Sequence, residues 1–170
     1  MLIRAKTPAD AAGCLELLLR VHKADGYPLH LDASEVGDFL VSEHETGAWV
    51  AEADGALVGL VGHVALHWAA DDPTIEAAAA ATGLPVARLA MVSRLFVAPQ
   101  LRRSGLGRAL LRHAAGKARS RGLRAVLDVG QALLAPIALY EAEGWTRVGE
   151  LHLPLDPDTM LDLWVYVSPA

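Results

Sequence analysis

Several protein classes are excluded by what this sequence lacks. Its 170 residues contain one cysteine, Cys14, so a single chain can form neither an internal disulfide nor a thiolate metal cluster, and we expect no metal cofactor. Cys14 lies on an apolar helix face and is expected to pack in the core. Aromatic residues make up only 5% of the chain and hydrophobic residues 53%, so alanine, leucine and valine must fill the interior of an ordered, globular protein.

Long hydrophobic segments are also missing. The most apolar run, residues 56–70, contains two histidines and two glycines and is shorter than the roughly 20 residues that cross a membrane, which favours a buried strand. The first eight residues contain no apolar segment followed by a small-residue cleavage site, so nothing indicates secretion. We therefore expect no membrane partner and a cytoplasmic location.

The net charge of the chain is -5, which excludes nucleic-acid binding by bulk electrostatics. The charge is uneven, because residues 102–124 carry much of the positive charge and residues 25–54 and 71–76 are acidic. An anionic ligand and a cationic ligand could therefore bind at different places. A length of 170 residues fits a single domain that covers residues 1–170.

The hydrophobic pattern predicts a mixed-sheet α/β domain in which strands and helices alternate. Strands are expected near residues 3–4, 49–51, 57–61, 88–97, 123–129, 145–153 and 160–167. Helices are expected over residues 8–22, 32–41, 73–82, 105–121 and 136–143. The pair Asp54 and Gly55 predicts a hairpin turn before residues 57–61, and the turn-rich residues 154–158 predict a loop between the last two strands.

Residues 91–111 combine a predicted strand, a basic turn with glycines and the start of a helix. Arg102, Arg103 and Arg108 flank Gly105 and Gly107, so backbone N–H groups, a helix N-terminus and guanidinium charge converge on one small volume. Glycine is needed there because a side chain would hold the ligand off the backbone. The pattern predicts a site for a phosphate or pyrophosphate.

The spacing of Arg102, Gly105 and Gly107 resembles motif A of the GNAT superfamily of N-acyltransferases, which grips the pyrophosphate of acetyl-coenzyme A (acetyl-CoA). The preceding L-F-V-A-P and the later L-Y-E-A-E-G-W, residues 139–145, stand where that family has its splayed strand and its Tyr-bearing helix. The resemblance covers roughly residues 88–150. It implies a mixed, mostly antiparallel sheet with a splayed central strand, flanked by helices, and acetyl-CoA as co-substrate.

The same resemblance implies how acetyl-CoA is held. The backbone N–H of Leu95 would face the thioester carbonyl, and Val97 would pair with the pantetheine arm. Such a role for Leu95 requires an irregularity, such as a bulge, that frees the strand from its neighbour. The residues implied in cofactor binding are Leu95, Phe96, Val97, Arg102, Arg103, Ser104, Gly105, Leu106, Gly107, Arg108 and Tyr140.

Tyr140 and the backbone of Leu95 are the implied catalytic groups. Tyr140 stands where the family usually has the acid that protonates the coenzyme A thiolate, and a phenol of pKa near 10 is a workable donor to a thiolate whose acid has a pKa of ~8.5. The chain departs from the family at Leu133, where many relatives carry an Asn, and at Pro136, where Ala is usual.

The general base is not assigned by the sequence. Some family members carry a Glu at the position of Met91, and the alternatives here are Glu52, His63, His67 and Ser93, each acting through a water.

An acidic segment, Asp25, Asp32, Glu35 and Asp38, follows the first predicted helix, in a region that borders the acceptor channel in the family. It could recognise a cationic amine or be a solvated acidic face.

These features indicate an N-acetyltransferase that transfers the acetyl group of acetyl-CoA directly to a primary amine of a small-molecule or peptide acceptor. A homodimer is compatible with this prediction. One alternative is a non-catalytic acyl-CoA sensor on the same fold. Another is a dinucleotide enzyme, because Gly105 and Gly107 have the spacing of a Rossmann turn, although Leu110 stands at the third glycine position.

Overall fold

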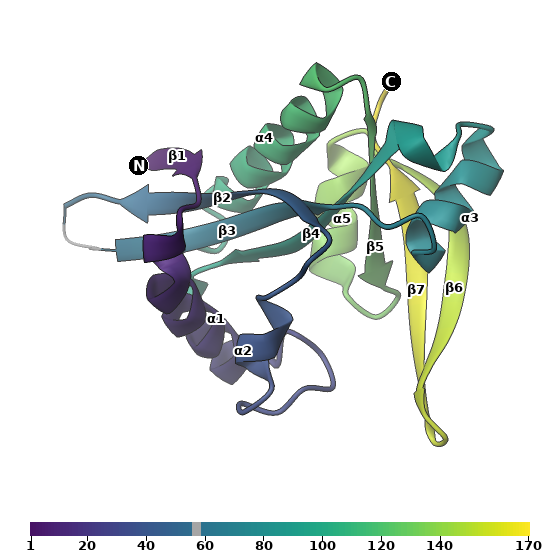
Figure 1. Ribbon diagram of the computed structural model, residues 1–170. Coiled ribbons are helices and arrows are strands. Elements are labelled where there is room, and N and C mark those ends of the chain that lie inside the picture. The colour runs from purple at the N-terminus through teal and green to yellow at the C-terminus, as the bar shows by residue number, and fades with distance from the viewer. Residues whose placement is uncertain (56–58) are drawn as a thin grey trace. The chain divides into compact units, whose positions relative to one another are not determined.

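Strands and helices alternate in the structure, a computed structural model that describes residues 1–55 and 59–170 (Figure 1). The described strands are β1 (Leu2–Ala5), β2 (Glu45–Ala53), β3 (Gly59–His67), β4 (Leu89–Val97), β5 (Arg124–Gly130), β6 (Thr146–Asp156) and β7 (Thr159–Val167). The described α-helices are α1 (Ala11–Asp25), α2 (Val36–Phe39), α3 (Pro73–Thr82), α4 (Leu106–Ser120) and α5 (Leu134–Ala142). Short 3₁₀ turns are η1 (Pro8–Asp10), η2 (Val86–Arg88) and η3 (Pro99–Leu101).

The strands form one sheet in the order β1-β2-β3-β4-β5-β7-β6. Strand β5 is parallel to β4, as expected for strands joined by the crossover helix α4, whereas the pairs β1–β2, β5–β7 and β6–β7 are antiparallel. The predicted mixed, mostly antiparallel sheet flanked by helices is therefore confirmed. This sheet contradicts the dinucleotide interpretation, because a Rossmann fold needs a mostly parallel sheet.

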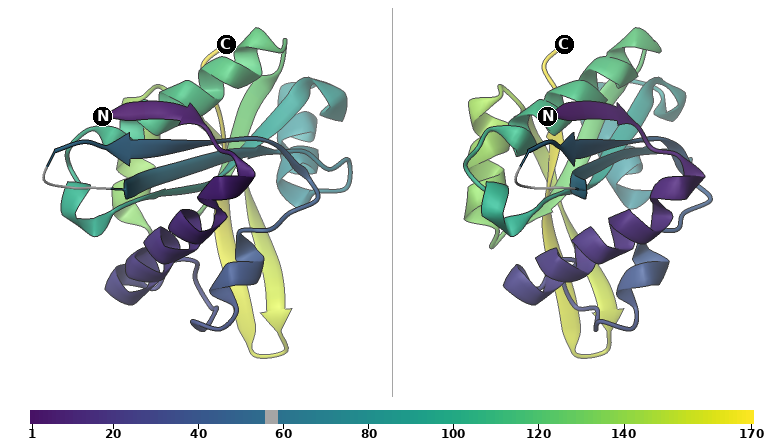
Figure 2. Two further views of the ribbon diagram at one scale, coloured as in Figure 1. Left: turned by 60° about the vertical axis from the view of Figure 1, so that its left-hand side comes forward. Right: turned by 90° about the vertical axis from the view of Figure 1, so that its left-hand side faces the viewer.

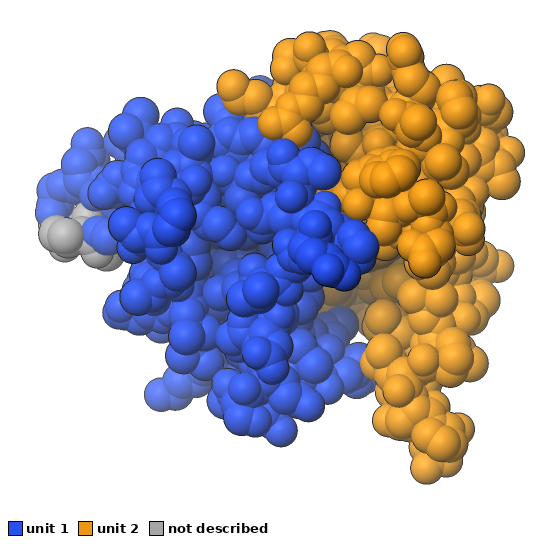
Figure 3. Space-filling view, in the orientation of Figure 1, with its two compact units in different colours: residues 1–66, 94–114 blue, residues 67–93, 115–170 orange. Residues whose placement is uncertain are grey.

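The chain divides into two compact units, coloured separately in Figure 3. The first unit consists of residues 1–66 and 94–114, and the second of residues 67–93 and 115–170. The boundary crosses β4 between Ser93 and Arg94, so the predicted turn at residues 102–108 belongs to the first unit and Tyr140 to the second. The single-domain organisation stays a prediction.

In the first unit, helices cover both faces of the strands, with α1 on one side of β2 and β3 and the start of α4 on the other (Figures 1 and 2). Thr7 and Asp10 form the predicted capping box, with η1 as the first turn before α1. Helix α1 buries Cys14, Leu17 and Leu18, as expected from its apolar face. Gly62 lets α4 lie close to β3, because a Cβ atom there would be 2.7 Å from Leu110 Cδ1.

The second unit has its own hydrophobic core between α3 and the strands. This core consists of Ile75, Ala78, Leu89, Val126, Val165 and Val167. Asp72 caps α3 by accepting hydrogen bonds from the amides of Thr74 and Ile75, and Gly83 ends the helix with a φ of 74°. The predicted helix 73–82 is thus confirmed.

Several predicted elements have wrong limits, and two of them differ in kind or are much reduced. The helix expected over 32–41 is reduced to α2, Val36–Phe39. The loop expected over 154–158 is mostly strand, because Pro154 pairs with Met160 and Asp156 with Thr159 in a long hairpin. Strand β6 lies at the edge of the sheet, where a proline needs no ladder donor.

The predicted hairpin turn near Asp54 is described only in part. Gly55 has a φ of 77°, as a turn glycine can, but the predicted partner residues 57 and 58 lie outside the described residues. Within residues 1–55 and 59–170, every helix is too short or too polar to cross a membrane.

Candidate active site

The basic turn between β4 and α4 has an irregular backbone. Arg103 and Gly105 have φ values of 62° and 86°, so left-handed residues alternate with others along the turn. The Ser104 hydroxyl donates to the carbonyl of Leu101 and accepts a 3.4 Å hydrogen bond from the Leu106 amide. Turns in which left-handed residues alternate with others can form concavities of backbone N–H groups that bind anions.

Helix α4 starts directly at this turn. The amide of Ala109 donates to the carbonyl of Gly105 at 3.0 Å, and the N–H groups of a first helical turn have no intrahelical acceptor. Residues 102–105 and Arg108 are exposed, so a ligand can reach both the amides and the guanidinium groups. The positive end of the helix dipole adds to this charge, and the turn can hold a phosphate or pyrophosphate.

Arg102 has a partner that the sequence did not indicate. Its Nη2 lies 2.5 Å from Oδ2 of Asp25, the last residue of α1. The ion pair joins one member of the acidic segment to the basic turn, across 77 residues of sequence. Asp25 therefore belongs to the surroundings of the turn, and an anionic ligand would compete with it for the Arg102 guanidinium.

Strand β4 is irregular next to Leu95. Arg94, the residue before Leu95, has a φ of 50°, which costs an L-residue roughly 1–2 kcal/mol. The parallel ladder described between β4 and β5 runs from Leu89 to Met91 and ends four positions before Leu95. The strand is thus kinked at Arg94, beyond the residues whose pairing with β5 is described.

His63, one of the alternative bases, holds this kink. Its Nδ1 lies 2.8 Å from the carbonyl oxygen of Arg94, and its Nε2 lies 3.4 Å from Nζ of Lys6. The imidazole stacks on Phe96 with ring centroids 4.9 Å apart. Burial lowers the pKa of His63 to about 4, so the ring is neutral at pH 7 with both nitrogens engaged. These contacts give His63 a role in the backbone geometry of β4.

The side chain of Arg94 joins β4 to the segment of α2. Its Nε donates to the carbonyl of Phe39 at 2.7 Å, and its guanidinium lies over the Phe39 ring at 4.6 Å from the centroid. Tyr27 packs edge-on against Phe39 with ring centroids 5.8 Å apart. The kink is therefore fixed through its carbonyl by β3 and through its side chain by α2.

The other alternative bases have partners of their own. Ser93 Oγ and His67 Nδ1 lie 2.5 Å apart in the second unit. Glu52, in the first unit, accepts a 2.9 Å hydrogen bond from Nε of Arg4. Neither contact assigns a base, so the base stays unassigned.

Two residues of the acidic segment cap a turn. The amide and hydroxyl of Ser34 both donate to Oδ1 of Asp32, and the amide of Asp32 donates to Oε2 of Glu35 at 2.8 Å. The hydroxyl of Ser34, followed by its amide, lowers the pKa of the Asp32 carboxyl. Asp38 lies in α2 and is exposed. The segment therefore combines local caps with a carboxylate that faces solvent.

Tyr140 lies in α5 and is buried, with 9% of the residue exposed. Its ring packs against Trp145 and Tyr166, with centroids 6.3 Å and 6.1 Å away. Burial, followed by the negative charge of Asp128, raises the pKa of Tyr140, so the phenol is protonated at pH 7. The phenol therefore carries a proton at pH 7, although it is a weaker acid than an exposed tyrosine.

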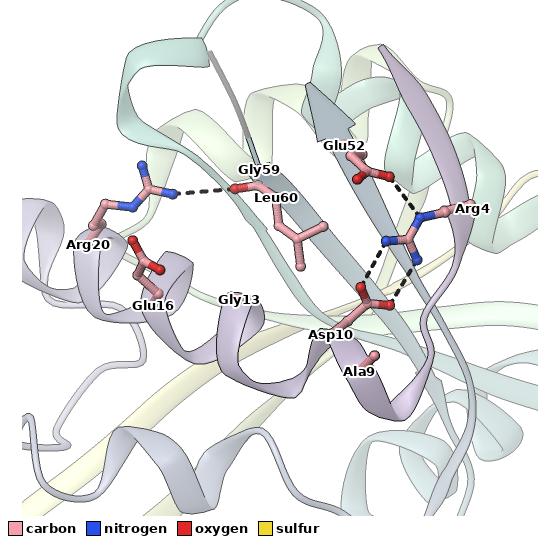
Figure 4. Close-up of a pocket in the computed structure, with 9 residues that line it drawn as sticks. All are labelled: Arg4, Ala9, Asp10, Gly13, Glu16, Arg20, Glu52, Gly59 and Leu60. Atoms are coloured by element: carbon pink, nitrogen blue, oxygen red, sulfur yellow. Dashed lines mark hydrogen bonds and ion pairs between the residues drawn. The ribbon is translucent and has the colours of Figure 1, made fainter. Parts of the chain in front are cut away.

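A polar pocket of about 220 Å³ lies between α1 and the strands of the first unit (Figure 4). Figure 4 shows the guanidinium of Arg4 directed at Asp10 and Glu52 and that of Arg20 directed at the carbonyl of Leu60. Arg4, Asp10 and Glu52 are thus paired with one another, which indicates a structural role for this side of the pocket.

The Arg4–Asp10 pair predicts a pH-dependent stability. Arg4, followed by the Thr7 amide, holds the pKa of Asp10 well below its usual range. A depressed folded-state pKa contributes stability that is present above the unfolded pKa of about 3.9 and is lost as pH falls through the folded value. Asp10→Asn is therefore expected to lower the free energy of unfolding at pH 7, with a smaller difference from wild type below about pH 4. Urea titrations across this range test it, and a difference independent of pH would contradict it.

Comparison with known proteins places the chain in a family. Residues 14–145 match the model of the Acetyltransferase (GNAT) family, which confirms the resemblance seen in the sequence. This chain belongs to that family.

Curated relatives of this chain carry the name N-acetyltransferase. Human N-acetyltransferase 8 is 31% identical over 120 residues, which are 70% of this chain and 47% of the human protein. Rat N-acetyltransferase 8 is 31% identical over 146 residues, which are 84% of this chain and 60% of the rat protein. The chain spans about half the length of the curated relatives it matches.

Solved structures share the fold. The ribosomal-protein-alanine N-acetyltransferase of Brucella melitensis superposes with a TM-score of 0.70 at 22% identity, over 100% of both chains. Arabidopsis thaliana NAA60, in complex with acetyl-CoA, gives a TM-score of 0.69 at 19% identity, over 98% of this chain and 96% of NAA60.

Proposed function

We propose that this protein transfers the acetyl group of acetyl-CoA directly to a primary amine of a small-molecule or peptide acceptor. The observation that carries the proposal is the kink at Arg94, one residue before Leu95, followed within a few residues by the basic turn of α4. Membership of the family adds support, and a solved protein of the same fold is in complex with acetyl-CoA.

Acetyl-CoA binding is assigned to the end of β4 and to the turn. The pyrophosphate accepts hydrogen bonds from the amides of Gly105 and Gly107 and lies near the exposed Arg103 and Arg108. Ser104 and Leu106 contribute the remaining backbone of the turn, and Val97 pairs with the pantetheine arm next to Phe96. The Arg102 guanidinium pairs with Asp25 and also contacts the phosphates.

The chemical step has a defined flow of electrons. The amine nitrogen attacks the thioester carbonyl carbon, the C–O π pair moves to oxygen, and the Leu95 N–H stabilises that oxyanion. The C–S bond then breaks, the sulfur takes its electron pair, and Tyr140 donates a proton to the thiolate. The amine loses a proton to a base or to water, so the products are an amide and free coenzyme A.

The direct test is a panel of amines incubated with acetyl-CoA, with release of free thiol and mass spectrometry of the acceptor as readouts. We expect thiol release that depends on both enzyme and acceptor, and an acceptor heavier by one acetyl group. Tight acetyl-CoA binding without transfer to any amine would instead indicate an acyl-CoA sensor.

Asp38 provides a test of acceptor charge. We propose that the acidic segment recognises a cationic amine, and Asp38→Asn removes an exposed charge without removing the caps formed by Asp32 and Glu35. A solvent-exposed ion pair contributes up to about 1 kcal/mol, so the acceptor KM should rise by up to about fivefold while the acetyl-CoA KM stays constant.

The matched control is Asp158→Asn, which removes an exposed charge from the β6–β7 turn. Steady-state kinetics of both variants at low salt check this prediction. Equal acceptor KM values for Asp38→Asn and wild type would leave the segment as a solvated acidic surface.

A further inference from the structure

His63 is a fully buried histidine, 0% exposed, in the middle of β3. A buried polar ring is costly unless its nitrogens are satisfied, and here each nitrogen has a defined neighbour. Those neighbours are the carbonyl oxygen of Arg94 at 2.8 Å and Nζ of Lys6 at 3.4 Å. Phe96 covers one face of the ring.

The two neighbours define the tautomer of the imidazole. A carbonyl oxygen can only accept, so Nδ1 carries the hydrogen and donates it to Arg94. An ammonium group can only donate, so the Nε2 lone pair accepts from Lys6, whose Nζ also lies 3.3 Å from Oε2 of Glu45. The charged groups facing His63 are thus Lys6, paired with Glu45, and the Arg94 side chain, which also favours a neutral ring.

The hydrogen bond reaches the peptide group that carries the proposed oxyanion donor. The carbonyl of Arg94 and the N–H of Leu95 belong to one planar trans peptide unit, so they point in opposite directions. When His63 Nδ1–H holds the carbonyl toward β3, the Leu95 N–H must point away from His63. Rotation of this peptide would move the Arg94 carbonyl out of reach of the His63 Nδ1–H and leave that buried N–H without its acceptor.

We propose that His63 is a positioning residue for acyl transfer, which orients the Leu95 amide by donating a hydrogen bond to the Arg94 carbonyl. This inference rests on the proposed function, because it assumes that Leu95 binds the oxyanion. It assigns to His63 neither contact with substrate nor proton transfer.

The experiment compares three substitutions that differ in what they can donate to Arg94. His63→Asn places an amide Nδ2–H where the imidazole Nδ1–H lies, so it keeps the hydrogen bond. His63→Gln is polar, but its amide lies one methylene further out, near the position of Nε2. His63→Leu has similar size and no donor. His44→Asn, an exposed histidine in the same unit, is the matched control.

Loss of one oxyanion donor costs about 10²- to 10³-fold in kcat, so misorientation should cost roughly 10- to 100-fold. We expect this loss in His63→Leu and His63→Gln, near wild-type kcat in His63→Asn, and acetyl-CoA affinity within threefold in all. The carbonyl stretch of bound ¹³C-labelled acetyl-CoA should shift to higher frequency only in the Leu and Gln variants, because the thioester is less polarised. If His63→Leu does not fold, the comparison of kcat between His63→Gln and His63→Asn still tests the proposal.

The proposal would be overturned if all three variants kept the wild-type kcat, or if kcat fell by the same factor in all three. A catalytic base is a separate possibility. In that case His63→Asn would lose activity although the hydrogen bond is kept, and the pH dependence of kcat would change with it. Failure of the proposed function is distinguishable, because wild type itself would transfer no acetyl group. In that case the ¹H–¹⁵N resonance of the Leu95 amide decides, with a clearly larger shift expected in the Leu and Gln variants than in His63→Asn, because all three lose the ring and only two lose the hydrogen bond.

Discussion

Replacing Tyr140 by Phe is expected to lower kcat by about 10²- to 10⁴-fold and to leave acetyl-CoA affinity nearly unchanged. The substitution keeps the ring that packs against Trp145 and Tyr166 and removes only the hydroxyl. Burial raises the pKa of Tyr140, so at pH 7 the wild-type phenol is in its proton-donating form. Without it, the thiolate must leave unprotonated or take its proton from water.

A single-turnover assay with a verified acceptor is the appropriate measurement, because slow product release can hide a change in the chemical step. Tyr166→Phe is the matched control. Its hydroxyl donates to Glu141 at 2.8 Å and accepts from Arg147, so its loss should lower stability and leave the single-turnover rate within a few-fold. A wild-type rate for Tyr140→Phe would show that the hydroxyl is not the acid.

Local signals explain which parts of the fold could be predicted. The order Asp72, Pro73 and Gly83 predicts both ends of α3, because a cap, a fixed φ and a left-handed residue each act within one turn. The helix limited to Val36–Phe39 was less predictable. Asp32 and Glu35 use their side chains to close a turn, which competes with the helical hydrogen bonds of the same residues.

The basic turn at residues 102–108 was predictable for the same reason, since its glycines and arginines are adjacent in the sequence. The contacts that hold β4 and the turn were not, because they join residues far apart. His63 and Arg94 are 31 positions apart, and Arg102 and Asp25 are 77 positions apart. The one signal in the sequence was a histidine inside an apolar run, which requires a buried partner without naming it.

Gly105→Val is expected to weaken acetyl-CoA binding by 100-fold or more, at about 1.4 kcal/mol for each factor of ten. Gly105 has a φ of 86°, and a Cβ atom added there would meet no heavy atom within 4 Å beyond its neighbours in the chain. The valine side chain would instead enter the volume assigned to the pyrophosphate. A β-branched residue also resists this φ, so the turn would shift and move its amides off the phosphate oxygens.

Backbone strain must be separated from loss of the site, and the other end of α4 offers the control. Gly122 has a φ of 73° and equally open surroundings, but lies outside the assigned turn. Both valine variants should lose roughly 1–2 kcal/mol of stability from a left-handed L-residue. Only Gly105→Val should lose acetyl-CoA binding in calorimetry, because only its side chain and its distorted amides meet the phosphates. Unchanged affinity in Gly105→Val, or equal loss in both variants, would place the acetyl-CoA site elsewhere on the protein.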